Sequence, residues 1–305
     1  MADQEFQQWH VAKPYIDLHC SLGEGPYYEK ATNTLRFLDI IQKRIHSVSL
    51  SEGPDSLKTL QLDSPIGVTA DIEGVDPQDK ILIAVKYGIA ILDRKTGKYD
   101  YLTKFVDGEG NPRLRSNDGG VDPLGHLWLG TMTDFDLGDC QPEGSLLRFD
   151  LNKAGETVKT GLTIPNTIGW SPDYKTLYFT HSSAGEVLAF DFNLADGSAS
   201  NERLFYKHEG SGGPDGFRVD VDGNIWHAIY GESRVIKISP QGKIVGQVNL
   251  PTRNITCTEF VGTELFITTA SDDDGEGDSK SYGGGLFRVD VGTTGVAPHK
   301  FKLNA

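Results

Sequence analysis

The stretch DPLGHLWLGT, residues 122–131, decides the fold of this chain. Its first half contains the Pro and Gly of a tight turn, and its second half is a short apolar strand. A turn with Asp and either Pro or Gly also precedes an apolar strand in SPDYK (171–175) before LYFTH (177–181) and in DVDGN (220–224) before IWHAI (225–229). Each copy therefore predicts a turn that leads into a strand of a β-hairpin.

Short apolar strands of this kind recur at intervals of 40 to 50 residues, as LRFLD (35–39), ILIAV (81–85), LWLGT (127–131), LYFTH (177–181), IWHAI (225–229) and LFITT (265–269). No segment shows a sustained helical period, so we expect little helix. Six such units predict an all-β, six-bladed β-propeller that uses residues 1–305 as one domain. Two β-sandwich domains are the alternative, but no linker-like composition interrupts the middle of the chain. The leader, residues 7–26, is expected to supply a strand that closes the last blade.

The composition limits the possible partners. The 305 residues include 43 acidic and 29 basic side chains, and the net charge of −14 opposes binding to nucleic acid or to an anionic membrane. The N-terminal residues MADQEFQQWH lack the features of a signal peptide, and no apolar run reaches membrane-spanning length. Cys20, Cys140 and Cys257 are far apart and form no CxxC motif, which favours a reducing compartment. We therefore expect a cytoplasmic protein with a small-molecule partner and leave its oligomeric state open.

Polar segments rich in acids, amides, Gly and Pro come ahead of the recurring strands in blades one, three, four and five, as GEGP (23–26), RSNDGG (115–120), IPNTIGW (164–170) and GGPDGF (212–217). If the recurring apolar strands are the innermost strands of the blades, these segments are loops that meet at one mouth of the central channel. One such segment alone indicates only an Asx-turn or a hairpin loop. Four in matching positions indicate a shared site.

The side chains of these segments suggest a metal site. Glu24, Asn117, Asn166 and Asp215 offer the carboxylate and amide oxygens that calcium, magnesium and manganese prefer. Arg115 adds a cation that can bind an oxyanion or a sugar hydroxyl. Because no HExxH or HxH pair occurs, a zinc hydrolase site is poorly supported, and we expect His181 and His227 to be structural.

The same segments resemble the motifs of the gluconolactonase, regucalcin and senescence-marker-protein family. The four matching stretches run from Glu24 to Asp39, from Arg115 to Met132, from Asn166 to Asp173 and from Pro214 to Trp226. They follow one another in the family's order over nearly the whole chain. The resemblance implies a six-bladed propeller that hydrolyses sugar lactones or other lactones with one divalent metal ion.

The resemblance also implies roles for individual residues. It places the metal on Glu24, Asn166 and Asp215, makes Asp215 the general base, and places Arg115 and Asn117 on the substrate. Calcium is the metal we expect first, before magnesium, manganese or zinc. In this chemistry the metal polarises the lactone carbonyl and Asp215 takes a proton from the attacking water.

One position departs from the family pattern. Some sugar-binding relatives use an acidic residue for a substrate hydroxyl three positions after the methionine of the GTM motif, where this chain has Phe135. The exact sugar therefore stays open.

Two other functions are compatible with the fold, because propellers serve many unrelated purposes. One is a non-catalytic propeller that binds calcium or a protein partner. The other is a broader esterase or organophosphate hydrolase of related propeller type. The acidic run SDDDGEGDS (271–279) lacks the glutamate that an EF-hand needs at its twelfth position, so we expect a solvated loop there.

Overall fold

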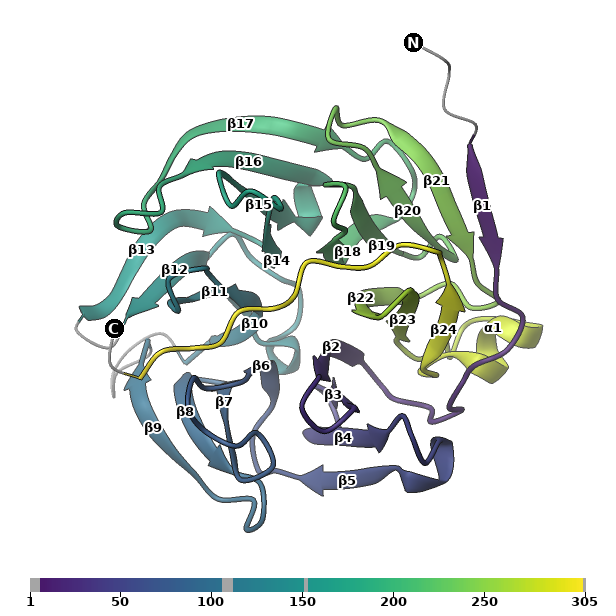
Figure 1. The fold of residues 1–305 in the computed structure, drawn as a ribbon, viewed down its shortest axis with the longest axis horizontal. Helices are drawn as coiled ribbons and strands as arrows, with labels where there is room; N and C mark the ends of the chain where they lie inside the picture. Colours follow the sequence, from purple (N-terminus) through teal and green to yellow (C-terminus); the bar gives the residue numbers. More distant parts are fainter. Residues whose placement is uncertain (1–5, 106–111, 151–152, 304–305) are drawn as a thin grey trace.

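The computed structural model describes residues 6–105, 112–150 and 153–303. In these residues six small sheets stand in a ring and form a six-bladed β-propeller, which confirms the predicted fold (Figure 1). The described helical segments are short: α1 (Gly277–Tyr282), η1 (Pro54–Ser56), η2 (Phe135–Leu137) and η3 (Ser182–Ala184). Among the described residues, no helix has the length and apolar character needed to cross a membrane.

Within each blade, consecutive strands pair antiparallel from the channel outwards. The innermost strands are β2 (Gly23–Glu29), β6 (Ile66–Ala70), β10 (Leu114–Val121), β14 (Pro165–Trp170), β18 (Gly213–Val219) and β22 (Ile255–Val261). The second strands are β3 (Thr34–Asp39), β7 (Lys80–Val85), β11 (Leu127–Thr133), β15 (Thr176–His181), β19 (Ile225–Tyr230) and β23 (Glu264–Thr269).

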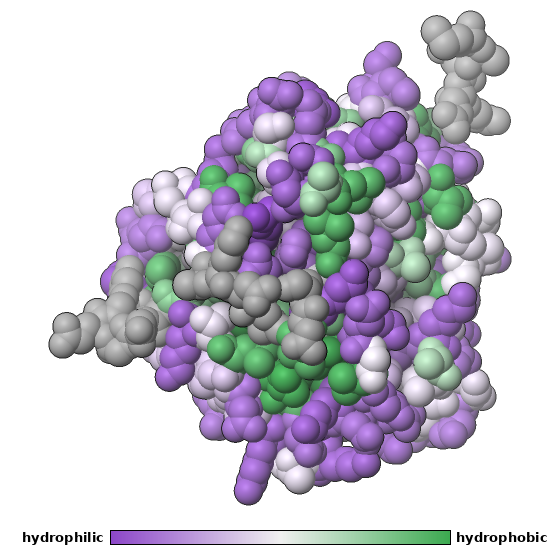
Figure 2. Space-filling model, turned by 60° about the vertical axis from the view of Figure 1, so that its left-hand side comes forward, coloured by the Kyte–Doolittle hydropathy of each residue, from purple (hydrophilic) through white to green (hydrophobic). Residues whose placement is uncertain are grey.

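The outer strands complete the blades. The third strands are β4 (Arg44–Ser49), β8 (Gly88–Asp93), β12 (Gly144–Asp150), β16 (Glu186–Phe192), β20 (Arg234–Ile238) and β24 (Phe287–Asp290). The fourth strands are β5 (Lys58–Gln61), β9 (Tyr99–Lys104), β13 (Lys153–Leu162), β17 (Ala199–Lys207) and β21 (Ile244–Asn249). Hydrophilic side chains predominate on the face of the molecule that Figure 2 shows.

The recurring apolar strands are the second strands of the blades, so the prediction that they are innermost is wrong. All seven residues of β11 are buried, for example, because neighbouring blades cover both faces of a second strand. The four polar segments are themselves parts of the innermost strands β2, β10, β14 and β18 rather than loops ahead of them. Their polar side chains therefore start from the strands that border the channel.

The turn at residues 122–126 joins β10 to β11, as predicted, and the Asp122 carboxylate holds it in place. This carboxylate accepts a hydrogen bond from the indole Nε1 of Trp128 at 3.0 Å. Gly125 has a φ of 96°, which favours glycine. Asp220 repeats the arrangement in blade five, where it accepts from Nε1 of Trp226 at 2.9 Å. One carboxylate thus fixes both the turn and the first large side chain of the next strand.

The hydrophobic core lies between blades rather than in one central mass. Blades one and two share a cluster that includes Leu38, Ile45, Ile66, Ile81 and Ile83. Similar clusters join the other neighbours around the ring. Because every blade is buried on both faces by its neighbours, the ring is stabilised as a unit.

The described residues of the leader do not add the predicted strand to the last blade. Its strand β1 (Gln7–His10) pairs in parallel with β21 of the fifth blade instead of the last. Further along, Ile16 and Leu286 of the sixth blade exchange backbone hydrogen bonds of 3.1 and 2.9 Å. Ile16 and Cys20 also pack in the cluster that joins blades six and one.

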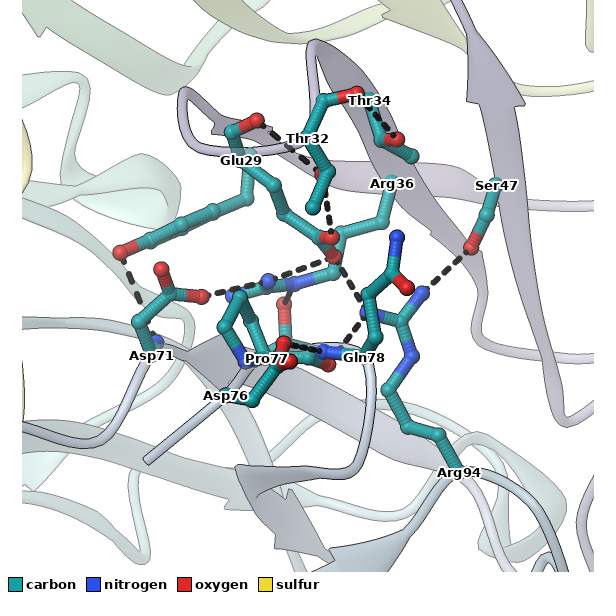
Figure 3. A network of polar contacts seen from close by, with 12 residues as sticks. Glu29, Thr32, Thr34, Arg36, Ser47, Asp71, Asp76, Pro77, Gln78 and Arg94 are labelled. Atoms are coloured by element: carbon teal, nitrogen blue, oxygen red, sulfur yellow. Dashed lines mark hydrogen bonds and ion pairs between the residues drawn. The ribbon is translucent and has the colours of Figure 1, made fainter. Parts of the chain in front are cut away.

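A buried ionic network connects blades one and two (Figure 3). Nη1 of Arg36 lies 2.8 Å from Oε1 of Glu29 and 2.7 Å from Oδ1 of Asp71, and Arg94 reaches the same Glu29 oxygen at 2.6 Å. The Arg36 guanidinium stacks on Tyr27, with its carbon 3.8 Å from the ring centroid. Burial alone would lower the pKa of Arg36, but the Asp71 and Glu29 carboxylates hold it above its ordinary value.

The C-terminal strap, residues 294–302, crosses one end of the channel (yellow in Figure 1). It forms backbone hydrogen bonds from Val296 to Val219 of blade five, from Phe301 to Asp71 of blade two and from Lys302 to Gly125 of blade three. A cavity of about 90 Å³ lies beneath the strap, lined by the C-terminal parts of inner strands and by residues 296–299.

Candidate active site

The polar side chains of the inner strands lie at the end of the channel opposite the C-terminal strap, where every inner strand has an irregular register. These shifts fall between Glu24 and Tyr27, Ile66 and Val68, Ser116 and Gly119, Pro165 and Ile168, Pro214 and Phe217, and Ile255 and Cys257. A β-bulge inserts extra residues into one strand and re-aims their side chains, and bulges are common beside active sites.

The bulges carry the candidate residues. Asn117 and Asp118 lie within the bulge of β10, Asn166 within that of β14 and Asp215 within that of β18, while Glu24 borders the bulge of β2. These residues are 4 to 9% exposed, so they are largely buried but keep a small contact with solvent. The structure thus brings the predicted residues of four blades to one end of the channel.

Direct contacts connect three of these blades. Nδ2 of Asn166 donates to Oδ1 of Asp215 at 2.5 Å. Asn117 donates through Nδ2 to the backbone carbonyl of Pro165 at 2.9 Å. Asp118 accepts a hydrogen bond from the Thr167 hydroxyl. Blades three, four and five are therefore linked at the level of the site.

The electrostatics of the site are dominated by three buried carboxyl groups. Burial raises the pKa of Glu24 well above its ordinary value, and repulsion from Asp215 and Asp118 raises it further. Burial also raises the pKa of Asp215, with a further contribution from Asp118, and it raises the pKa of Asp118. Carboxylates that repel one another in a dry site are stabilised by a divalent cation.

The donor atoms fit a hard cation such as calcium. Glu24 and Asp215 offer carboxylate oxygens, and Asn166 offers an amide oxygen. In this structure Nδ2 of Asn166 faces Asp215, so the amide has to present Oδ1 instead in order to serve as a ligand. Among the described residues, no group of three or more His, Cys, Asp or Glu side chains is arranged to hold a metal ion. The candidate set therefore depends on the amide.

Arg115 lies beside the carboxyl groups and is 1% exposed. Its Nη1 donates to the backbone carbonyl of Ser116 at 2.6 Å, and its Nη2 contacts the sulfur of Met132 at 3.3 Å. Within the part of the chain that the structure describes, its Nε is buried without a hydrogen-bond partner. Burial lowers the pKa of Arg115 to about 10, against an opposing effect of Asp134.

Asp118 is the residue that sequence reasoning missed. The resemblance assigned a role to Asn117 and none to its neighbour, and in a regular strand only one of the two side chains would face the channel. The bulge of β10 breaks this alternation and leaves both residues unpaired with β11. The sequence signal is the run of four polar residues before two glycines in RSNDGG.

His181 and His227 are both held by hydrogen bonds outside the group of carboxyl side chains. His227 is fully buried, and its Nε2 lies 2.9 Å from the Thr180 hydroxyl. Burial lowers the pKa of His227 to about 3. His181 accepts a hydrogen bond from the backbone N–H of Thr163 at 3.2 Å. Both side chains are therefore held by hydrogen bonds to the protein, and their structural role stays a prediction.

The acidic run at residues 271–279 lies between β23 and β24 and is largely exposed, as expected, but it is more ordered than a simple solvated loop. Asp272 is buried and pairs with Arg253, whose Nη2 lies 2.5 Å from Oδ1 of Asp272. The run also leads into the helix α1, because Ser279 lies within it. The Ser279 hydroxyl donates to Asp272 at 2.5 Å, so the run is held by its own contacts.

Comparisons with known proteins identify the family of the chain. Residues 22–271 match the model of the SMP-30/gluconolactonase/LRE-like region. The chain is 33% identical to pentonolactonase XacC of Haloferax volcanii, over 92% of this chain and 94% of that protein. It is 31% identical to regucalcin of Xenopus laevis, again over 92% and 94% of the two chains.

A solved structure shows the same fold. It is that of a calcium-binding protein, regucalcin, from Agrobacterium tumefaciens, which superimposes with a TM-score of 0.87 and 25% identity over 97% of this chain and 99% of the other. The family model, the relatives and the structural similarity all extend over most of the chain. The chain therefore belongs to the SMP-30/gluconolactonase/LRE-like family.

Proposed function

We propose that the protein is a metal-dependent lactonase that opens a sugar-type lactone to its hydroxy acid. The observation that carries this proposal is the group of buried carboxyl and amide side chains from four blades at one end of the channel. Family membership supports it, because named relatives include a pentonolactonase and a structural neighbour is a gluconolactonase.

Glu24, Asn166 and Asp215 would hold the metal, for which calcium is the first candidate. When bound, a divalent ion would polarise the lactone carbonyl. It would also offset the repulsion that raises the pKa of Glu24 and Asp215.

Asp215 would act as the general base. With one carboxylate oxygen of Asp215 on the metal, its second oxygen could accept a proton from a water molecule. The water oxygen bonds to the carbonyl carbon, the bond between that carbon and the ring oxygen breaks, and the proton passes to the ring oxygen to give the hydroxy acid.

Arg115 and Asn117 would position the substrate. The unpartnered Nε of Arg115 is a donor that a lactone oxygen can satisfy. Asn117 is held by the backbone of Pro165 through Nδ2, which leaves its amide oxygen for a substrate hydroxyl.

Chelation tests the metal directly. We expect excess EDTA to abolish lactone hydrolysis and calcium to restore it, with a rise in melting temperature, because a ligand that binds only the folded state stabilises it by about 2.7 kcal/mol at 100 times its Kd. A panel of aldonolactones in a pH-indicator assay, combined with thermal melts, measures both effects. Activity that survives exhaustive chelation would contradict the metal-dependent mechanism.

The stabilisation by calcium should also depend on pH. Glu24, Asp118 and Asp215 have raised pKa values in the folded chain. Their contribution to stability is therefore fully present below about pH 4, near the unfolded pKa values, and is lost as pH rises through the folded values. We expect the melting temperature in EDTA to fall as the pH is raised from about 5 to 8, and the gain from calcium to grow over this range. An equal rise in melting temperature with calcium at both pH values would mean that the cation binds away from these three carboxyl groups.

Arg115 offers a test that separates substrate positioning from metal binding. Arg115→Met keeps an unbranched buried side chain but removes every donor, so we expect kcat/KM to fall by about 10²-fold, as for an interaction made in the transition state. The rise in melting temperature with calcium should persist, because a cation beside the metal does not help to bind it. If the variant loses its response to calcium, Arg115 instead has a structural role.

A further inference from the structure

Phe135 lies at the same end of the channel as the carboxyl groups. It is the first residue of η2, which follows β11, and the last residue of β11, Thr133, pairs with Leu114 at the start of β10. Phe135 is 43% exposed, whereas Arg115 beneath it is buried. The phenyl ring is therefore a part of the rim that a molecule approaching Arg115 meets.

The ring covers the guanidinium group. The Arg115 carbon Cζ lies 4.1 Å from the centroid of the Phe135 ring, which is close stacking of a cation on an aromatic face. The neighbouring carboxylate, Asp134, is engaged by the ammonium group of Lys86. Phe135 thus presents carbon atoms at a place where a polar side chain would present a hydrogen-bonding group.

We infer that Phe135 makes this edge of the substrate site apolar, so that the preferred lactone has no hydroxyl group on the part of its ring that faces Phe135. The substrate class is then a deoxygenated or alkyl-substituted lactone rather than a fully hydroxylated aldonolactone. This inference rests on the proposed lactonase function and narrows its substrate.

The physical reason is desolvation. A hydroxyl group that is placed against a phenyl ring loses its hydrogen bond to water and gains none, whereas a methylene or methyl group gains apolar contact. Differences of this kind change kcat/KM by about 10- to 200-fold between substrates. A carboxylate at the same position would reverse the preference, because it accepts a hydrogen bond from the hydroxyl group.

The experiment compares three five-membered lactones: ribonolactone, its deoxy analogue and γ-valerolactone, with the calcium-loaded enzyme. We expect kcat/KM for the better of the two less hydroxylated lactones to exceed that for ribonolactone by about tenfold or more. The ratio of kcat/KM for the less hydroxylated lactone to kcat/KM for ribonolactone should fall about tenfold in Phe135→Glu. In Phe135→Leu, which keeps an apolar rim, this ratio should change little.

Leu137→Glu is the matched control. Leu137 lies in the same η2 and is 46% exposed, so this variant adds the same charge at a similar exposure without replacing the ring over Arg115. Its ratio should stay at the parental value, and melting curves should show that all variants are folded. A parental enzyme that prefers ribonolactone, or an unchanged ratio in Phe135→Glu, would overturn the inference and leave the lactonase proposal standing. Failure to hydrolyse any lactone under these conditions would overturn both.

Discussion

Replacing Asp215 by asparagine will lower the rate of lactone hydrolysis by about 10²-fold or more, the scale on which removal of a general base acts. The amide keeps an oxygen ligand of the same shape, so the variant can still hold metal, although more weakly for the lost charge. It cannot accept a proton from water. The rate must therefore be measured at saturating metal, after elemental analysis has confirmed the occupancy.

Asp222→Asn is the control for this substitution. Asp222 lies on the same hairpin but in the exposed turn at the opposite end of the channel, and its replacement should leave the rate unchanged. A fully loaded Asp215→Asn variant with a near-parental rate would make Asp215 a ligand only. The base would then be sought at Asp118, which lies at the same end of the channel with a raised pKa, rather than at the deeply buried His227.

The largest loss of stability is expected from Arg36→Ala. Removal of one partner of a buried ionic network leaves uncompensated charge in a dry environment and costs about 3–5 kcal/mol. Here the variant would leave Asp71 without its guanidinium partner and Glu29 with Arg94 alone. Denaturant titration measures the free energy of unfolding.

The exposed pair of Arg203 and Asp191 provides the comparison. Its atoms are also 2.8 Å apart, but the two side chains are 48% and 53% exposed, so Arg203→Ala should cost about 0–1 kcal/mol. Equal losses for the two variants would mean that the buried network contributes no more than a surface ion pair.

The fold could be predicted from sequence because each repeat is defined by residues that are close together in the chain. Turns such as 122–126 carry their own stabilising carboxylate, and the strands that follow them are continuously apolar. The strong apolar character of these strands also caused the wrong assignment of the inner strand. A second strand is buried on both faces and gives the strongest hydrophobic signal, whereas an inner strand borders the channel and carries polar residues, glycines and a bulge.

The site was predicted in part for a related reason. Matching positions in repeated units imply convergence in space, which was enough to predict that Glu24, Asn117, Asn166 and Asp215 lie at one end of the channel. Asp118 was missed because its segment was taken for a loop and the resemblance assigned a role only to its neighbour Asn117. The stacking of Phe135 on Arg115 could not be predicted either, since it depends on how η2 folds back over β10.

The C-terminal strap has a consequence for how long the folded protein persists. By bonding to blades two, three and five, it joins blade five to two blades that are not its neighbours in sequence, so blade five cannot separate from them until the strap has detached. A contact that must break before the rest of the molecule opens raises the barrier to unfolding and extends the half-life of the native state, even when its share of the equilibrium stability is small. We therefore expect the durability of this enzyme, including its resistance to proteases, to depend on a few residues that belong to no blade.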